Sequence, residues 1–205
     1  MNATYFLFAF SGLTLSACAP ILTAKPVQTV QQLDVAQPSP QALPLNFKLT
    51  SLDFPSRGTL NLAQVADGFG CTGGNISPAL SWSGVPEGTE SLALTLFDPD
   101  APTGSGFWHW VVYNLPARST SLNAGAGTAG GTLPAGAAQL KHDGGQAGFL
   151  GACPPVGDQP HRYVLTLYAL SQRLDLPNTV SPAYLGFNLN GITLAKASVT
   201  AFYGR

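Results

Sequence analysis

Short apolar segments separated by glycine and proline run through the chain from residue 46 to its end. The 205 residues include 23 glycines and 17 prolines, while 45% of the residues are hydrophobic. Glycine and proline mark turns, and short segments rich in β-branched and aromatic residues are typical of strands. This pattern favours a mainly β fold, a sandwich of many short strands, and disfavours a helical bundle.

The individual segments agree with this interpretation. Residues 91–97 are expected to form a largely buried strand that Pro99 ends, because proline cannot continue a ladder of hydrogen bonds. The other expected elements are strands over 47–52, 80–82, 108–115, 163–170 and 195–203, a glycine-rich loop over 123–136 and a helical turn over 182–189.

The first eighteen residues have the pattern of an export signal. Residues 5–15 form an apolar stretch of signal-peptide length, too short to span a bilayer. The stretch ends in Leu15-Ser16-Ala17-Cys18, which resembles the lipobox of bacterial lipoproteins, where the cysteine is lipidated. Residues 1–4 contain no Lys or Arg, so a start assigned too late and ordinary cleavage near Ala19 stay open. We expect a lipoprotein-type signal peptide over 1–18, and a protein exported to a bacterial periplasm or membrane-anchored through Cys18.

Residues 19–45 have the composition of a flexible linker. They contain Gln, Pro, Ala and Ser and few large apolar side chains, which bury too little surface to order a chain. The folded domain is therefore expected over 46–205. The formal charge of −1 and the lack of a Lys/Arg cluster predict no nucleic-acid partner. Contact with a membrane is expected only through the lipid anchor.

The three cysteines fit an oxidising compartment. If Cys18 takes the lipid, Cys71 and Cys153 remain as one pair. Cys71 lies in a glycine-rich turn and Cys153 lies beside two prolines, and disulfides are common in such loops. We expect a Cys71–Cys153 disulfide, with two unrelated buried thiols as the alternative.

Two motifs about fifty residues apart contain most of the side chains capable of chemistry. The first runs Asp98-Pro99-Asp100-Ala101-Pro102 and continues to Phe107-Trp108-His109-Trp110, and the second joins Gly151-Ala152-Cys153-Pro154-Pro155 to His161-Arg162-Tyr163. Only 9% of the residues are charged, against about 25% in ordinary soluble domains. A chain this poor in ionisable groups is expected to use these few at a specific place.

Alternation along strands predicts which of these side chains meet. His161 and Tyr163 should share one face of their strand, with Arg162 on the other. On the preceding motif, the expected partners of His109 on its face are Phe107 and Val111, with Trp108 and Trp110 opposite. Asp98 and Asp100, two residues apart at a strand end, are expected to point into one cavity.

Two imidazoles, a phenol and loop amides suit a small anion, because their hydrogen bonds strengthen when the acceptor is charged. The aspartates would then orient the histidines, or one of them would be protonated by proximity to the other. Metal binding by Asp98, His109 and His161 is the lesser reading, since no short metal motif is present, and no metal or cofactor is expected. His142, between Lys141 and Asp143, is expected to be a solvated loop residue.

The motifs, in this order, resemble the phosphatidylethanolamine-binding protein family, the Raf-kinase-inhibitor-like proteins, and specifically its bacterial branch. The resemblance covers about residues 46–205, and the segments 70–82 and 202–205 agree with it. It implies a Greek-key β-sandwich with one or two short helices, a pocket for phosphate-like or carboxylate anions, and a cis peptide bond before Pro102. The pocket residues that it implies are Asp98, Asp100, Pro102, His109, Gly151, Pro155, His161 and Tyr163.

The leading hypothesis is therefore an exported, non-catalytic binding protein for a small phosphorylated or carboxylated anion. One alternative is an inhibitor of an envelope or secreted partner enzyme, because the family contains kinase and protease inhibitors. A second is a weak hydrolase in which His109 or His161 acts as general base. The sequence offers no convincing nucleophile for that reaction, so no catalytic residue is assigned.

Overall fold

The computed structural model describes residues 46–205. The expected signal peptide over 1–18, its lipidation site Cys18 and the linker over 19–45 lie outside the described residues. In chain order the elements are β1 (Lys48–Ser51), the 3-10 turn η1 (Leu62–Gln64), β2 (Asp67–Gly68), β3 (Cys71–Thr72), β4 (Leu80–Ser83), β5 (Ser91–Asp98), β6 (Phe107–Pro116), β7 (Ser121–Leu122), β8 (Ala138–Gln139), β9 (His161–Leu170), α1 (Pro182–Leu189) and β10 (Thr193–Tyr203).

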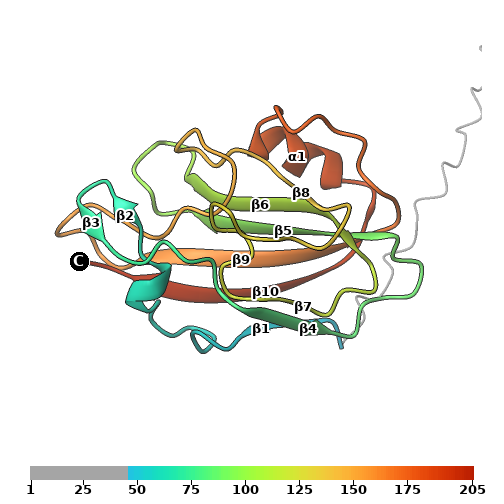
Figure 1. Ribbon diagram of the computed structural model, residues 1–205, viewed down its shortest axis with the longest axis horizontal. Coiled ribbons are helices and arrows are strands. Elements are labelled where there is room, and N and C mark those ends of the chain that lie inside the picture. Colours follow the sequence, from blue (N-terminus) through green and yellow to red (C-terminus); the bar gives the residue numbers. More distant parts are fainter. Residues whose placement is uncertain (1–45) are drawn as a thin grey trace, which may run out of the picture. The chain divides into compact units, whose positions relative to one another are not determined.

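The strands form two packed antiparallel sheets and one small hairpin. The larger sheet has the order β10-β9-β5-β6-β8, the smaller has the order β1-β4-β7, and β2 pairs with β3. After the β5–β6 hairpin the chain crosses to β7 in the smaller sheet and then returns to place β9 on the other side of β5, which is a Greek-key path. Figure 1 shows β1, β4 and β7 along one side of the larger sheet and α1 on the other. The mainly β prediction is confirmed.

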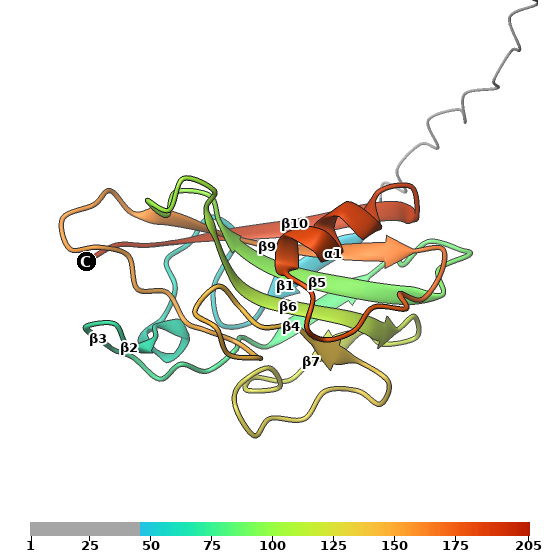
Figure 2. The same cartoon turned by 90° about the horizontal axis from the view of Figure 1, so that it is seen from above.

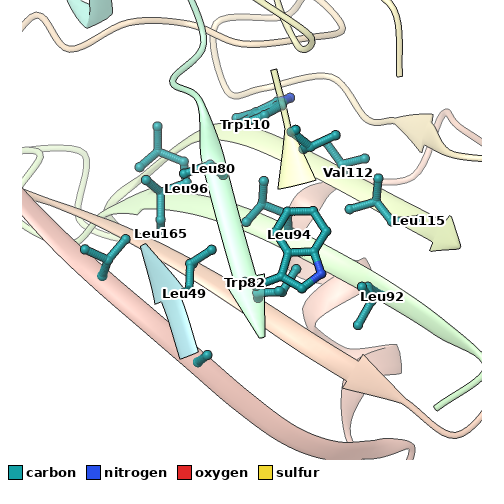
Figure 3. Packing of buried hydrophobic residues seen from close by; sticks show 14 of the residues in the cluster. Leu49, Leu80, Trp82, Leu92, Leu94, Leu96, Trp110, Val112, Leu115 and Leu165 are labelled. Carbon is teal, nitrogen blue, oxygen red and sulfur yellow. The ribbon is translucent and has the colours of Figure 1, made fainter. Parts of the chain in front are cut away.

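The main hydrophobic core lies between the two sheets. The smaller sheet contributes Leu49, Leu80 and Trp82, and the larger one contributes leucines of β5 and β9 together with Trp110 and Val112 of β6. Figure 3 shows these side chains pointing toward one another across the space between the sheets. Burying side chains of this size contributes about 1.5–3 kcal/mol each. The apolar alternation of the strands is therefore what joins the two sheets.

The second face of the larger sheet is covered by α1. Ser181 caps the helix by accepting a hydrogen bond from the backbone N–H of Tyr184, and Pro182 occupies the first helical position. Leu185 and Leu189 of α1 are buried against the outward face of β5 and β6. In the turned view of Figure 2 the helix lies in front of this sheet, with β1 and β4 behind. Because both faces are covered, β5 is buried along almost its whole length, as its sequence predicts.

One irregularity of β6 determines where its side chains point. Opposite β5 the pairing passes from Leu96 with Trp110 to Phe97 with Trp108, so His109 is an extra residue in a β-bulge. Trp110 consequently belongs to the core between the sheets, whereas Trp108 and Val111 pack on the face that α1 covers. The expectations that Trp110 faces away from His109 and that Val111 shares its face are therefore wrong. Simple alternation cannot anticipate an inserted residue.

Between residues 46 and 205, the structure contains no helix long and apolar enough to cross a membrane.

Candidate ligand-binding site

A cavity of about 210 Å³ opens where β5 ends and β6 and β9 begin. Asp98 is the last residue of β5 and pairs with Phe107, the first residue of β6, while His161 is the first residue of β9. The strand ends therefore bring residues from both sequence motifs to one place. The cavity is lined by Phe69, Asp98, Ala101, Pro102, Thr103, Phe107, His109, Leu150, Gly151, Cys153, Pro154, Pro155, His161 and Tyr163.

Asp98 organises the floor of this cavity. Its Oδ1 accepts hydrogen bonds from the backbone N–H groups of Asp100 (2.8 Å) and Ala101 (3.1 Å), which closes the turn after β5. Its Oδ2 lies 2.7 Å from Nδ1 of His161, and both side chains are almost fully buried. Asp98 therefore sets the conformation of the 98–103 turn and the orientation of the His161 ring at the same time.

His161 is held between two carboxylates. Its Nδ1 donates to Asp98, and its Nε2 lies 3.3 Å from Oδ2 of the half-exposed Asp158. Burial lowers the pKa of His161, but the hydrogen bonds and negative charges of Asp98 and Asp158 outweigh burial and raise it above its ordinary value. The ring therefore favours the imidazolium form, in which a carboxylate accepts from each nitrogen.

Asp100 does not line the cavity. The guanidinium of Arg162 donates to it from Nε (2.9 Å) and from Nη2 (2.6 Å), and the backbone N–H of Arg162 adds a third bond at 2.8 Å. The hydrogen bonds from Arg162 lower the pKa of Asp100 to about 2. Arg162 lies on the opposite face of β9 from His161 and Tyr163, as strand alternation predicts, so Asp100 turns outward to meet it. The expectation that Asp98 and Asp100 share one cavity is wrong.

His109 enters the cavity from the bulge in β6. Its Nδ1 lies 3.0 Å from the carbonyl oxygen of Leu150, and only 6% of the residue is exposed. Burial lowers the pKa of His109 to about 4, although the Leu150 carbonyl and the charge of Asp98 act in the opposite direction. The ring is consequently neutral at pH 7. A carbonyl can only accept, so the single ring proton resides on Nδ1.

Tyr163 packs its ring edge-on against the ring of His109, with ring centroids 5.3 Å apart, and both residues line the cavity. Its hydroxyl is buried and has no hydrogen-bond partner, a property that it shares only with Oε1 of Gln64 among the buried side-chain atoms of residues 46–205. Burial, followed by the negative charge of Asp98, raises the pKa of this phenol above its ordinary value, so it keeps its proton. Buried polar groups are nearly always paired, so this hydroxyl lacks an acceptor. Tyr163 lines this cavity and also a smaller interior one that it shares with Gln64.

The remaining predicted residues form the rim. Pro102 and Pro155 line the cavity, and Gly151 packs so closely that an added Cβ would lie 2.4 Å from the backbone nitrogen of Ala66. The peptide bond before Pro102 is trans, so the cis bond implied by the resemblance is wrong. In the structure the turn is closed by the two bonds to Asp98 and by the N–H of Thr103 donating to Ala101.

A disulfide connects two parts of this rim. The structure places the sulfurs of Cys71 and Cys153 2.10 Å apart, across a sequence separation of 82 residues. It ties the β2–β3 hairpin to the loop that contains Gly151. At the tip of that hairpin, Phe69 is 71% exposed and adopts a left-handed backbone conformation with φ of 55°. Phe69 lines the cavity mouth, which sequence reasoning did not anticipate.

Three further residues were missed or misjudged. Asp158 and the Leu150 carbonyl contact the histidines, but neither belongs to a recognisable motif. His142 is buried, not solvated: its Nδ1 accepts from the backbone N–H of Gly144 at 3.0 Å, and burial lowers its pKa. Within the described part of the chain, no group of three or more His, Cys, Asp or Glu residues could hold a metal ion.

The chain resembles a known family and several proteins of known sequence. The sequence model of the family described as "Phosphatidylethanolamine-binding protein" matches residues 50–204. Among curated relatives, UPF0098 protein YbcL of Escherichia coli is 50% identical over 159 residues, covering 77% of this chain and 87% of the relative. UPF0098 protein YbhB of Escherichia coli is 46% identical over 158 residues, covering 77% and 99%. A protein of Mycobacterium tuberculosis named "Putative lipoprotein LppC" is 38% identical over 151 residues, covering 71% and 65%.

Solved structures give the same assignment. The crystal structure of Escherichia coli YbcL, described as a member of the mammalian PEBP family, has a TM-score of 0.76 and 49% identity, and the match covers 78% of this chain and 99% of that one. A phosphatidylethanolamine-binding protein homologue from Chlamydia trachomatis, CT736, has a TM-score of 0.66 and 30% identity, with coverage of 78% and 98%. This chain belongs to the phosphatidylethanolamine-binding protein family.

Proposed function

We propose that this protein is a non-catalytic binding protein whose cavity accepts a small phosphorylated or carboxylated anion. The observation that carries the proposal is the unpartnered, buried hydroxyl of Tyr163, a residue that lines the cavity. A phosphate or carboxylate oxygen is the acceptor that it lacks, and such charge-assisted bonds are the stronger kind. The family description names a lipid with a phosphate-containing headgroup, which agrees with this chemistry.

The size of the cavity limits the ligand. Its volume of about 210 Å³ is below the roughly 300–1,000 Å³ of pockets that enclose drug-sized molecules. Apart from the polar groups at its floor, the wall is formed largely by proline, phenylalanine and leucine side chains. A headgroup-sized anion fits this space, and any apolar remainder of a ligand would extend past Phe69 at the mouth.

For the alternative of a weak hydrolase, the cavity offers a candidate general base, but its described residues offer no free nucleophile. The unprotonated Nε2 of His109 has the character of a general base. However, the hydroxyl of Thr103 donates to the carbonyl oxygen of Gly106, and Cys153 is in the disulfide, so neither is free to attack a substrate. Hydrolysis of p-nitrophenyl phosphate that disappears in His109→Asn would support the enzyme and contradict our proposal.

We extend the proposal to the location of the protein: exported and membrane-anchored through a lipid on Cys18. Support comes from the lipobox-like residues 15–18, from a disulfide of the kind that persists in oxidising compartments, and from the relative named as a lipoprotein. Metabolic labelling with a radioactive fatty acid should mark the full chain but not Cys18→Ser. Equal labelling of both would overturn the anchor.

The binding function is tested by NMR titration with phosphate and phosphoethanolamine, following the imidazole signals of His109 and His161. We expect saturable shifts in both rings. Tyr163→Phe removes only the unpartnered hydroxyl and should weaken binding by about 10-fold to 100-fold, the equivalent of about 1.5–3 kcal/mol for a hydrogen bond to a charged group.

The matched control is Tyr168→Phe, which removes a hydroxyl from the same strand, β9, on the face packed toward α1. This variant should bind as the wild type does. Flat histidine signals up to millimolar anion, or equal weakening by both substitutions, would overturn the proposed site.

A further inference from the structure

The hydrogen bond from His109 to Leu150 restricts which ligands the cavity can accept. The carbonyl oxygen of Leu150 has no proton to give, so Nδ1 of His109 must be the donor at 3.0 Å. In a neutral imidazole this leaves Nε2 with a lone pair and no proton. On the ligand side, the ring therefore presents an acceptor, which is the wrong partner for an oxygen of a fully deprotonated anion.

The charged groups near His109 do not offset its lack of a proton on Nε2. Asp98 and His161 form an ion pair beside the ring, and Asp158 places a second carboxylate on the far nitrogen of His161. Tyr163 is a neutral phenol, and His142, in the loop behind His109, is a buried histidine whose Nδ1 already accepts from the backbone. Among residues 46–205, no group that faces His109 supplies a free positive charge.

We propose that the cavity binds its anion together with one proton, which is shared between Nε2 of His109 and an oxygen of the ligand. The proposal rests on the proposed function and narrows it. It selects oxyacids that still keep a proton near neutral pH, such as phosphate and phosphomonoesters. It disfavours sulfate, which has the same tetrahedral shape but no proton, and simple carboxylates.

Tyr163 and His109 would then bind different oxygens of the ligand. Tyr163 donates to one unprotonated oxygen, and the protonated oxygen donates to His109, so each buried polar atom finds a complementary partner. With sulfate, an oxygen and Nε2 would meet as two acceptors in a desolvated space. A mismatch of this kind costs about 1–3 kcal/mol and is a common basis of selectivity between ligands of equal shape.

The test is calorimetric titration of the full chain with phosphate, sulfate and phosphoethanolamine between pH 5.5 and 8.5, in buffers of different ionisation enthalpy. We expect sulfate to bind at least about tenfold more weakly than phosphate at pH 7, equivalent to about 1.4 kcal/mol. Phosphoethanolamine loses its last phosphate proton at its second ionisation, at about pH 6, so above it the affinity should fall by about tenfold per pH unit with uptake of one proton. Inorganic phosphate keeps one proton as HPO4²⁻ throughout this range, so its affinity should change much less. Nitrogen-15 NMR should show Nε2 of His109 unprotonated in the free protein and changed on binding.

Two variants separate His109 from its neighbour. His109→Asn can place an amide N–H where Nδ1 lies and keep the bond to Leu150, but it lacks the Nε2 lone pair, so phosphate and sulfate affinities should converge. His142→Asn can place an amide oxygen where Nδ1 accepts from Gly144, and it should keep the wild-type preference.

The outcomes distinguish the two proposals. If phosphate and sulfate bind equally at pH 7, or if phosphoethanolamine affinity does not change with pH, the shared proton is wrong while the anion site stands. If neither anion binds at any pH, the proposed function fails and this inference fails with it.

Discussion

Replacing Asp98 with asparagine preserves the shape of the side chain and removes the charge that stabilises His161. The amide oxygen can still accept from the backbone N–H groups of Asp100 and Ala101, so the turn after β5 is retained. The amide N–H₂ group takes the place of Oδ2 and faces Nδ1 of His161 as a donor. His161 can satisfy this donor only by giving up its Nδ1 proton and becoming neutral.

The cost follows from these contacts. Removing one partner of a buried ion pair costs about 3–5 kcal/mol when nothing replaces it. Asparagine keeps two of the three hydrogen bonds and offers a substitute for the third, so we expect a smaller loss of unfolding free energy. The remaining loss is that of one charge-assisted hydrogen bond, about 1.5–3 kcal/mol.

The loss depends on pH. The pKa of folded His161 is raised, against the effect of burial, by Asp98 and Asp158. The stability that this contributes is fully present below the unfolded-state pKa, about 6.5, and is lost as pH rises through the folded pKa. Asp98→Asn should therefore destabilise the protein most near pH 6 and least in alkaline solution. With the Asp98 charge gone and burial dominant, the pKa of His161 should fall.

Urea denaturation at pH 6 and pH 9 measures the first effect, and an NMR titration of the histidine signals measures the second. The matched control is Asp100→Asn, the same change two residues away on a carboxylate that lies outside the cavity. It should leave the pKa of His161 nearly unchanged. An unaltered His161 pKa in Asp98→Asn, or an equal loss of stability at both pH values, would refute the reasoning.

Two further predictions concern the rim. Replacing both Cys71 and Cys153 with serine should lower the unfolding free energy by about 2–4 kcal/mol, because the disulfide closes a long loop in the unfolded chain. Adding reductant to the wild type should cause the same loss in urea denaturation. An unchanged unfolding free energy in both experiments would contradict this prediction. Phe69→Asn should raise Tm, with a gain of up to about 1 kcal/mol in unfolding free energy, because asparagine tolerates the left-handed backbone and little apolar surface is lost. The control Phe187→Asn changes an equally exposed phenylalanine in a helix and should show no gain. The reverse order of Tm would count against backbone strain at Phe69.

The long strands were predictable from their apolar residues. Because both faces of β5 are covered, most of its side chains are apolar. Residues 91–97 are almost uniformly apolar, and the observed strand is Ser91–Asp98. The helix over 182–189 was predictable for a local reason, since Ser181 and Pro182 form an ordinary helix start. In both cases the determining interactions are close in sequence or follow a regular period.

The side-chain directions at the site were less predictable, because they depend on non-local pairing. The bulge at His109 exists only relative to its partner β5, and it moves Trp110 to the face opposite to the one that alternation indicates. Asp100 turns outward because Arg162, 62 residues away, offers it a fork of N–H donors. Neither cause can be read from the residues beside the one that moves.

The two aspartates, wrongly expected to point into one cavity, instead fix the same turn from opposite sides. Asp98 binds the backbone of the 98–103 turn and His161 inside the cavity, while Asp100 binds Arg162 outside it. Because His161 and Arg162 are consecutive residues of β9, the turn is tied to one strand end on both of its faces. A rim held in this way would lose little conformational freedom on binding the proposed anion, so more of the contact energy would remain for affinity. We therefore expect the exposed Asp100–Arg162 pair to influence binding through the shape of the turn, because Asp100 lies outside the cavity.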